Sequence, residues 1–209
     1  LAHELGHGIH QYLAGKKQTY FNSSTPLTLA ETASVFGEML TFKSILKKTV
    51  NKNERKGLLA NKVEDMINTV VRQIAFYEFE KRIHERRKIK ELSVEEISSI
   101  WMEVQKNSLG PSIKFEDDYK YFWSYIPHFI HSPFYVYAYA FGDCLVNSLY
   151  NVYETNPFEF EDKYINLLES GGNNSYDQLL KPFGLNPKNK NFWYKGIKVI
   201  EDFIDQLED

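Results

Sequence analysis

The chain carries the segment His-Glu-Leu-Gly-His at residues 3–7. An α-helix turns once in about 3.6 residues, so His3 and His7 lie on one face and can direct two imidazole nitrogens at one metal ion. Glu4 lies beside them, within reach of a water molecule at the metal without being a ligand itself. The pattern predicts a helix that holds a zinc ion next to a general base.

A catalytic zinc ion needs a third protein ligand and leaves its fourth position to water. One known pattern has a third histidine ten residues after the first, but that position is Leu13, which cannot bind a metal. His10 shares the face, yet three histidines in line along a straight helix cannot converge on one ion. Carboxylates remain, and we expect Glu31 to be the third ligand and Glu38, two turns later, to orient a histidine N–H.

Glu31 has an alternative role. The segment Thr28-Leu-Ala-Glu31 fits a capping box, in which the carboxylate of Glu31 would bond back to the backbone of Thr28. The short chain distance from His7 favours a metal ligand instead, because a second helix can pack on the first and deliver the carboxylate. If Glu31 caps the helix, Glu38 is expected to bind the metal.

Composition indicates a globular protein. Of the 209 residues, 43% are apolar and 15% aromatic, which is enough for a sizeable core. The net charge of -3 argues against a general binder of nucleic acids or membrane surfaces, and the chain has no apolar run of the roughly eighteen residues that span a membrane. The single cysteine, Cys144, cannot form an internal disulfide, which fits a reducing compartment such as the cytoplasm or a protein indifferent to its redox compartment. The chain begins at Leu1 inside the motif helix, so we expect an upstream portion outside this sequence.

Apolar residues recur every three or four positions along most of the chain, which predicts a mainly α protein with little or no sheet. We expect helices over residues 1–14, 29–50, 53–87, 93–108, 134–154 and 157–170, followed by two short terminal helices. The apolar positions of the third helix are Leu59, Val63, Met66, Val70, Ile74, Tyr77 and Ile83.

Several residues are expected to set helix boundaries. Gly15 should end the first helix. Ser93 and Glu96 form a capping box that opens the helix over 93–108, and Gly110-Pro111 should end it. Gly142-Asp143 should interrupt the helix over 134–154 and can mark a close backbone approach.

Four parts of the chain carry a family resemblance. They are residues 1–12 with 30–34 and Glu38, then Ile-Pro-His-Phe-Ile-His-Ser-Pro-Phe-Tyr-Val-Tyr-Ala-Tyr at 126–139, Leu-Leu-Glu-Ser-Gly-Gly at 167–172, and residues 192–207. Together they resemble the oligoendopeptidase F family of thimet-oligopeptidase-like metallopeptidases. Zinc aminopeptidases fit less well, because their spacing would place the third ligand at Pro26.

The resemblance implies a zincin-type, multi-helix catalytic domain with the metal between two helices. His3, His7 and Glu31 match the family's zinc ligands, and Glu4 matches its catalytic base. The family's N-terminal half forms the other wall of a channel for short, unfolded peptides. We therefore expect residues 1–209 to be the C-terminal catalytic part of a larger peptidase whose N-terminal half is absent.

Peptide hydrolysis by zinc needs a hydrogen-bond donor for the oxyanion that develops on the scissile carbonyl, and tyrosine and histidine are suitable. Residues 126–139 resemble the family's substrate-facing segment and supply both types. The candidates, in order of preference, are His131, Tyr139, Tyr137, His128 and Tyr135. Each can instead be structural, and the alternating tyrosines fit either a short strand or a helix.

The sequence is compatible with three functions. The preferred one is a zinc endopeptidase that cleaves internal bonds of oligopeptides, with zinc-bound water as nucleophile and Glu4 as base. A related zinc carboxypeptidase and an inactive helical fragment are the alternatives. The same ligands accept cobalt or manganese.

Overall fold

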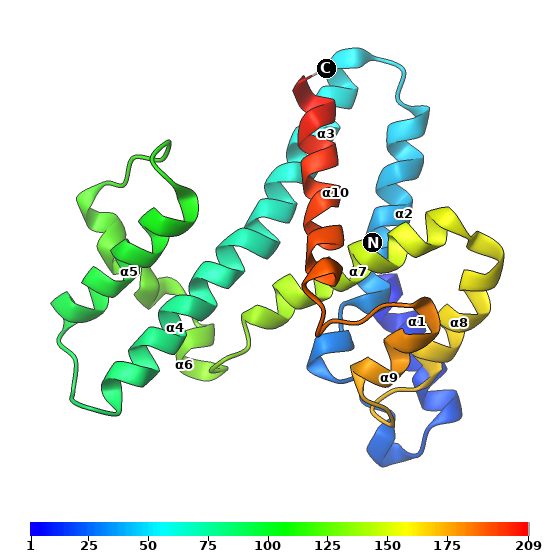
Figure 1. Ribbon diagram of the computed structural model, residues 1–209, viewed down its shortest axis with the longest axis horizontal. Coiled ribbons are helices and arrows are strands. Elements are labelled where there is room, and N and C mark those ends of the chain that lie inside the picture. Colours follow the sequence, from blue (N-terminus) through cyan, green and yellow to red (C-terminus); the bar gives the residue numbers. More distant parts are fainter. Residues whose placement is uncertain (209) are drawn as a thin grey trace. The chain divides into compact units, whose positions relative to one another are not determined.

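The computed structural model describes residues 1–208, and the mainly α architecture is confirmed, with no strand in that range. Backbone contacts divide the chain into two compact units. One comprises residues 1–66 and 141–209, and the other comprises residues 67–140. Figure 1 shows the helices along the chain.

The first unit contains the motif helix and the C-terminal third of the chain. Its helices are α1 (Ala2–Lys17), α2 (Thr32–Lys48), α3 (Lys52–Ile67), α7 (Tyr137–Thr155), α8 (Pro157–Glu169), α9 (Tyr176–Leu180) and α10 (Lys190–Glu208), and the short 3-10 turns are η1 (Tyr20–Asn22), η2 (Leu27–Leu29) and η5 (Lys181–Phe183). The last residue of α3 and the first turn of α7 lie beyond the boundary of this unit. Helix α1 packs against α2 and α8 (Figure 1).

Aromatic packing fixes the beginning of α2. The ring of Phe36 stacks on Phe160 of α8 with centroids 5.4 Å apart and lies 4.7 Å from the ring of Tyr164. The hydroxyl of Tyr164 donates to the backbone oxygen of Thr32 at 3.0 Å. Because Glu31 immediately precedes Thr32, this packing also holds the backbone that carries the candidate third ligand.

Several boundaries in this unit differ from the prediction, and α2 runs over Thr32–Lys48 instead of residues 29–50. Helix α1 continues through Gly15 to Lys17, because Gly15 keeps a negative φ and Lys16 and Lys17 suit the negative end of the helix dipole. The last helix is also longer than predicted. Phe192, Gly196, Ile200 and Phe203 are buried along one face, so α10 extends over 19 residues.

The second unit is built around Trp101. Its elements are the π-helical turn η3 (Asn68–Arg72), α4 (Gln73–Arg87), α5 (Val94–Leu109), the 3-10 segment η4 (Asp117–Tyr125) and α6 (His128–His131). The indole of Trp101 is 1% exposed and lies 5.4 Å from the ring of Phe76 and 5.2 Å from that of Phe79. Phe129 of α6 packs on the same group, with its ring 5.1 Å from Phe79. This core therefore anchors α6 to α4 and α5.

The long helix predicted over 53–87 contains one π turn. Such a turn inserts one residue into the helix and displaces the apolar position that directly follows it, whereas the predicted positions Tyr77 and Ile83 still pack against the core. Leu59, Val63, Met66 and Val70 are buried as predicted, but Ile74 is 51% exposed and Ala75 is buried in its place. The prediction for Ile74 is wrong for this reason.

The predicted capping box is confirmed. Ser93 Oγ accepts from the backbone N–H of Glu96, whose carboxylate accepts from the backbone N–H of Ser93. Gly110, with φ 72°, follows the last residue of α5. Helix α7 begins at Tyr137 instead of Phe134, because Phe134 has a φ of 60° and cannot belong to a right-handed helix.

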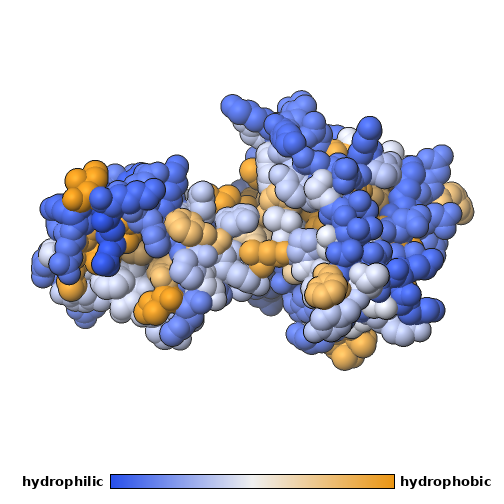
Figure 2. Space-filling view, turned by 90° about the horizontal axis from the view of Figure 1, so that it is seen from below, coloured by the Kyte–Doolittle hydropathy of each residue, from blue (hydrophilic) through white to orange (hydrophobic). Residues whose placement is uncertain are grey.

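Figure 2 shows one face of the molecule, and this face has few extended apolar areas. Hydrophilic side chains cover most of it, and hydrophobic ones gather in small, separate groups. Within residues 1–208, no helix has the length and apolar character that a membrane crossing requires.

Candidate metal centre

His3 and His7 lie one turn apart on α1, as the motif predicts. Their Nε2 atoms are 3.1 Å apart, and the rings meet edge to face with centroids 4.7 Å apart. Both side chains are about one-third exposed. Two nitrogen lone pairs can therefore be directed at one point that solvent can reach.

Glu31 occupies the position just before α2 and completes the group. Its Oε2 lies 3.6 Å from the Nε2 of His3 and 3.6 Å from the Nε2 of His7. The hydroxyl of Ser34, which is fully buried, donates to the same Oε2 at 2.7 Å. The carboxylate thus faces the histidine pair, which favours the metal-ligand role over the capping role with Thr28.

The three atoms fit a zinc ion. Zinc–nitrogen and zinc–oxygen bonds of about 2.0–2.1 Å in a tetrahedral site place neighbouring ligand atoms about 3.3–3.4 Å apart. The corresponding distances here are 3.1, 3.6 and 3.6 Å. In the part of the chain that the structure describes, His3, His7 and Glu31 form the one group of three or more metal-ligating side chains that meet this closely.

Glu38 lies on the other side of His3. Its Oε1 is 3.3 Å from the Nδ1 of His3. A proton held on Nδ1 by this carboxylate leaves Nε2 with its lone pair, which is the tautomer that a metal ligand needs. The contact favours the role predicted for Glu38, which stays a prediction.

Two glycines allow neighbouring segments of the chain to approach each other closely at the site. A Cβ on Gly6 would lie 2.5 Å from the Ala33 oxygen and from the Ser34 Cα, so α1 and α2 touch along their backbones there. A Cβ on Gly142 would lie 3.0 Å from the Cβ of Glu31. Gly142 does not interrupt α7, contrary to the prediction, but the close approach predicted for it is present.

Substituting Gly6 with alanine is expected to separate α1 from α2. The added methyl group has backbone atoms of α2 in its way, so we expect a loss of about 1–3 kcal/mol in unfolding free energy and weaker zinc binding. The matched control is Gly8→Ala on the same helix, where a Cβ would meet no atom within 4 Å. This substitution should be neutral or slightly stabilising. Urea unfolding and zinc titration of both variants provide the test, and equal behaviour would contradict the close contact.

Glu4 and His10 occupy different surroundings on α1. Glu4 is exposed and, within residues 1–208, makes no ion pair. His10 is 3% exposed, and burial together with the neighbouring His7 lowers its pKa to about 4. His10 is therefore a neutral core residue near pH 7 and lies outside the metal group, as predicted.

The predicted oxyanion donors belong to the unit of residues 67–140. The Tyr139 hydroxyl lies 3.3 Å from the Nε2 of His128, and the ring of Tyr135 lies 5.3 Å from that of Tyr139. Tyr137 instead packs on the ring of Tyr77 at 5.8 Å, and His131 is exposed at the end of α6. The structure thus joins His128, Tyr135 and Tyr139 into one group and leaves Tyr137 and His131 outside it.

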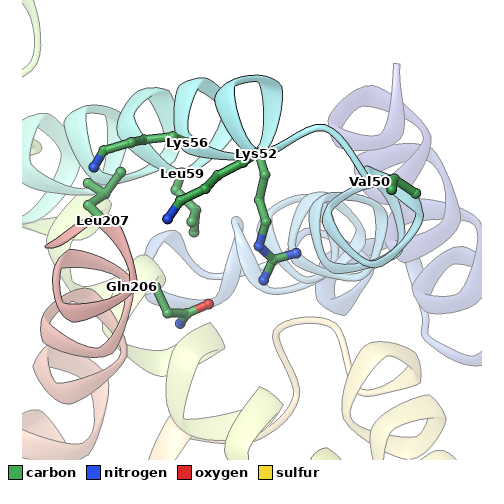
Figure 3. A pocket seen from close by; sticks show the side chains of 7 residues that line it. Val50, Lys52, Lys56, Leu59, Gln206 and Leu207 are labelled. Atoms are coloured by element: carbon green, nitrogen blue, oxygen red, sulfur yellow. The ribbon is translucent and has the colours of Figure 1, made fainter. Parts of the chain in front are cut away.

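Two other features of the first unit lie outside the metal group. Burial and the neighbouring Asp143 raise the pKa of Cys144 to about 12, so its buried thiol stays protonated and is no nucleophile. A pocket between α3 and α10 is shown in Figure 3. It is lined by Val50, Lys52, Arg55, Lys56, Leu59, Gln206 and Leu207, none of which is a candidate site residue.

The sequence matches a known family along nearly its whole length. The sequence profile of peptidase family M3 matches residues 1–199. The chain belongs to peptidase family M3. The predicted resemblance to oligoendopeptidase F is confirmed by relatives of that name.

Three of these M3 relatives illustrate the similarity. The chain is 36% identical over 173 residues to an oligoendopeptidase F homolog of Borreliella burgdorferi, covering 82% of this chain and 29% of the relative. It is 29% identical to the plasmid oligoendopeptidase F of Lactococcus lactis subsp. cremoris over all of this chain and 35% of the relative. The crystal structure of oligoendopeptidase-F from Enterococcus faecium superposes with a TM-score of 0.83 at 26% identity, covering 99% of this chain and 37% of that one. The chain therefore spans about a third of the length of these M3 relatives.

Ser34 contacts Glu31 but is not among the site residues that the sequence predicts. Its position three residues after Glu31 places it one helical turn further along, which is the spacing of side chains that contact each other. A serine at that spacing from a predicted ligand is a usable signal. It does not by itself reveal that the hydroxyl is buried and turned toward the carboxylate.

Proposed function

We propose that this chain forms the zinc-binding catalytic part of a metallopeptidase that cleaves internal bonds of short, unfolded peptides. One observation carries the proposal: two imidazole nitrogens and one carboxylate oxygen lie 3.1–3.6 Å from one another beside an exposed glutamate. Membership of peptidase family M3 supports the proposed peptidase activity.

In this proposal, His3, His7 and Glu31 hold the metal. Bound zinc supplies a Lewis acid that polarises a water molecule and the substrate carbonyl. Glu38 keeps a proton on the Nδ1 of His3, and Ser34 fixes the rotamer of Glu31 by donating to its Oε2. The donor set suits zinc, because it combines two imidazoles with one carboxylate and leaves a solvent-accessible side.

Glu4 is proposed to act as general base and then as general acid. Its exposed carboxylate takes a proton from the attacking water and gives it to the leaving amine. A donor from residues 128–139 is proposed to stabilise the developing oxyanion. His131, Tyr139, Tyr137 and His128 are the candidates, and the contact between Tyr139 and His128 favours these two as a unit.

The proposals for the substrate and for the rest of the enzyme rest on the family resemblance. Oligopeptides are the proposed substrates, and the remaining part of the polypeptide is proposed to form the other wall of the channel. The proposal places the enzyme in a reducing compartment such as the cytoplasm, which the buried free thiol of Cys144, the one cysteine of this chain, supports.

The test uses the complete polypeptide that contains this chain and a fluorogenic peptide with both ends blocked. We expect cleavage at an internal bond, a loss of at least about 100-fold after chelation, and recovery with zinc. Cleavage that survives removal of all metal would contradict the zinc proposal. Removal of one C-terminal residue from free peptides, with blocked peptides left intact, would favour the carboxypeptidase alternative.

A further inference from the structure

Glu80 is a buried carboxylate in the second unit. It lies on α4, directly after Phe79 of the core around Trp101, and is 2% exposed. Its Oε1 accepts the backbone N–H of Phe134 at 2.7 Å. Its Oε2 is buried and has no hydrogen-bond partner within residues 1–208. Burial is the largest influence on this carboxyl and raises its pKa.

The backbone that Glu80 contacts is strained. Phe134 has a φ of 60°, a backbone conformation that residues other than glycine rarely adopt. It is the one non-glycine residue with a positive φ in the described part of the chain. Its ring lies 4.7 Å from that of His84, which stands one turn after Glu80 on α4. Glu80 and His84 thus hold the backbone and the side chain of Phe134 from the same helix.

Phe134 lies in the turn between α6 and α7. The turn follows His131, at the end of α6, and leads through Tyr135 to Tyr139 in the first turn of α7. Phe129 before the turn and the fully buried Val136 after it belong to the core around Trp101. Between these two anchors, the hydrogen bond from Phe134 to Glu80 holds the turn to α4.

We propose that Glu80 is a positioning residue, whose carboxylate oxygen anchors the strained turn at Phe134 and thereby sets the placement of the histidines and tyrosines that stabilise the oxyanion. Burying a carboxylate with one oxygen unsatisfied lowers the stability of the fold. A turn with no functional role would not require such a group, so its presence here favours a role in positioning the turn. This inference rests on the proposed function, because the anchor matters for catalysis only if the His–Tyr group contacts the reacting carbonyl.

Two conservative substitutions separate the acceptor from the charge. Glu80→Gln removes the negative charge but keeps an oxygen at the same reach, so kcat should stay within about threefold of the wild type. Glu80→Asp keeps the charge but is one methylene shorter, which withdraws the acceptor from Phe134. We expect its kcat to fall on the order of 10–100-fold, as for a misplaced oxyanion donor, with KM within about threefold.

The assays use the complete zinc-loaded enzyme, with rates expressed per folded, zinc-containing molecule. Zinc content should match the wild type in both variants, because the metal-binding residues belong to the other unit. A kcat for Glu80→Asp equal to that of the wild type would overturn the inference, as would a Glu80→Gln variant more impaired than Glu80→Asp. Glu4→Gln is measured in parallel: if it retains full activity, the proposed function itself fails, and not only the role of Glu80.

Discussion

Replacing Glu4 with glutamine is expected to lower peptide cleavage by about 1,000-fold or more while the enzyme keeps its zinc. The amide has nearly the same shape as the carboxylate but cannot accept the proton of the attacking water, and general base catalysis of this kind contributes about 10²–10⁴-fold. The three metal-binding side chains are untouched, so metal content should not change. Steady-state kinetics and metal analysis of the same preparation measure both effects.

The matched control for this variant is Glu54→Gln. Glu54 is also an exposed glutamate in the first turn of a helix, α3, so its substitution has a similar effect on helix charge without reaching the site. Its activity should equal that of the wild type. If Glu4→Gln also retained full activity, Glu4 could not be the base.

Replacing Glu31 with glutamine is expected to remove the metal and, with it, the activity. The neutral amide loses the negative charge that holds the cation, while its volume and its contact with Ser34 can persist. We expect zinc affinity to fall by more than the 10–100-fold that is typical for substitution of an outer partner of a metal ligand. Competition with a chromogenic chelator gives the dissociation constant directly.

Glu38→Gln is the informative companion to this variant. Glu38 contacts only the outer nitrogen of His3, so its substitution should cost about 10–100-fold in zinc affinity and leave a bound metal at high zinc concentration. The reverse order, with Glu38→Gln losing the metal and Glu31→Gln retaining it, would identify Glu38 as the third ligand.

The part of the site that the sequence predicts well is local in the chain. His3 and His7 are separated by one helical turn, and a helix alone brings their nitrogens together. Glu31 follows after a short connection, so packing of the next helix suffices to bring its carboxylate to the pair. In these cases, helix geometry fixes the contact.

The features that the sequence did not predict depend on backbone irregularities or on distant contacts. The π turn η3 displaced the apolar position that directly follows it, so Ile74 was assigned to the core in error. A strained φ at Phe134 delayed the start of α7, and no pattern of residue types announces such a value at a phenylalanine. Glu80 contacts a residue 54 positions away, and an isolated glutamate within an apolar helix face was the one available signal.

The most direct test of the metal centre is the zinc content of the wild-type chain after dialysis against a weak chelator. About one zinc ion per chain, lost on substitution of His3, His7 or Glu31, is the predicted result, because all three ligand atoms lie within 3.6 Å of one another without further rearrangement. A chain without zinc, with the complete polypeptide equally metal-free, would contradict the three-ligand centre.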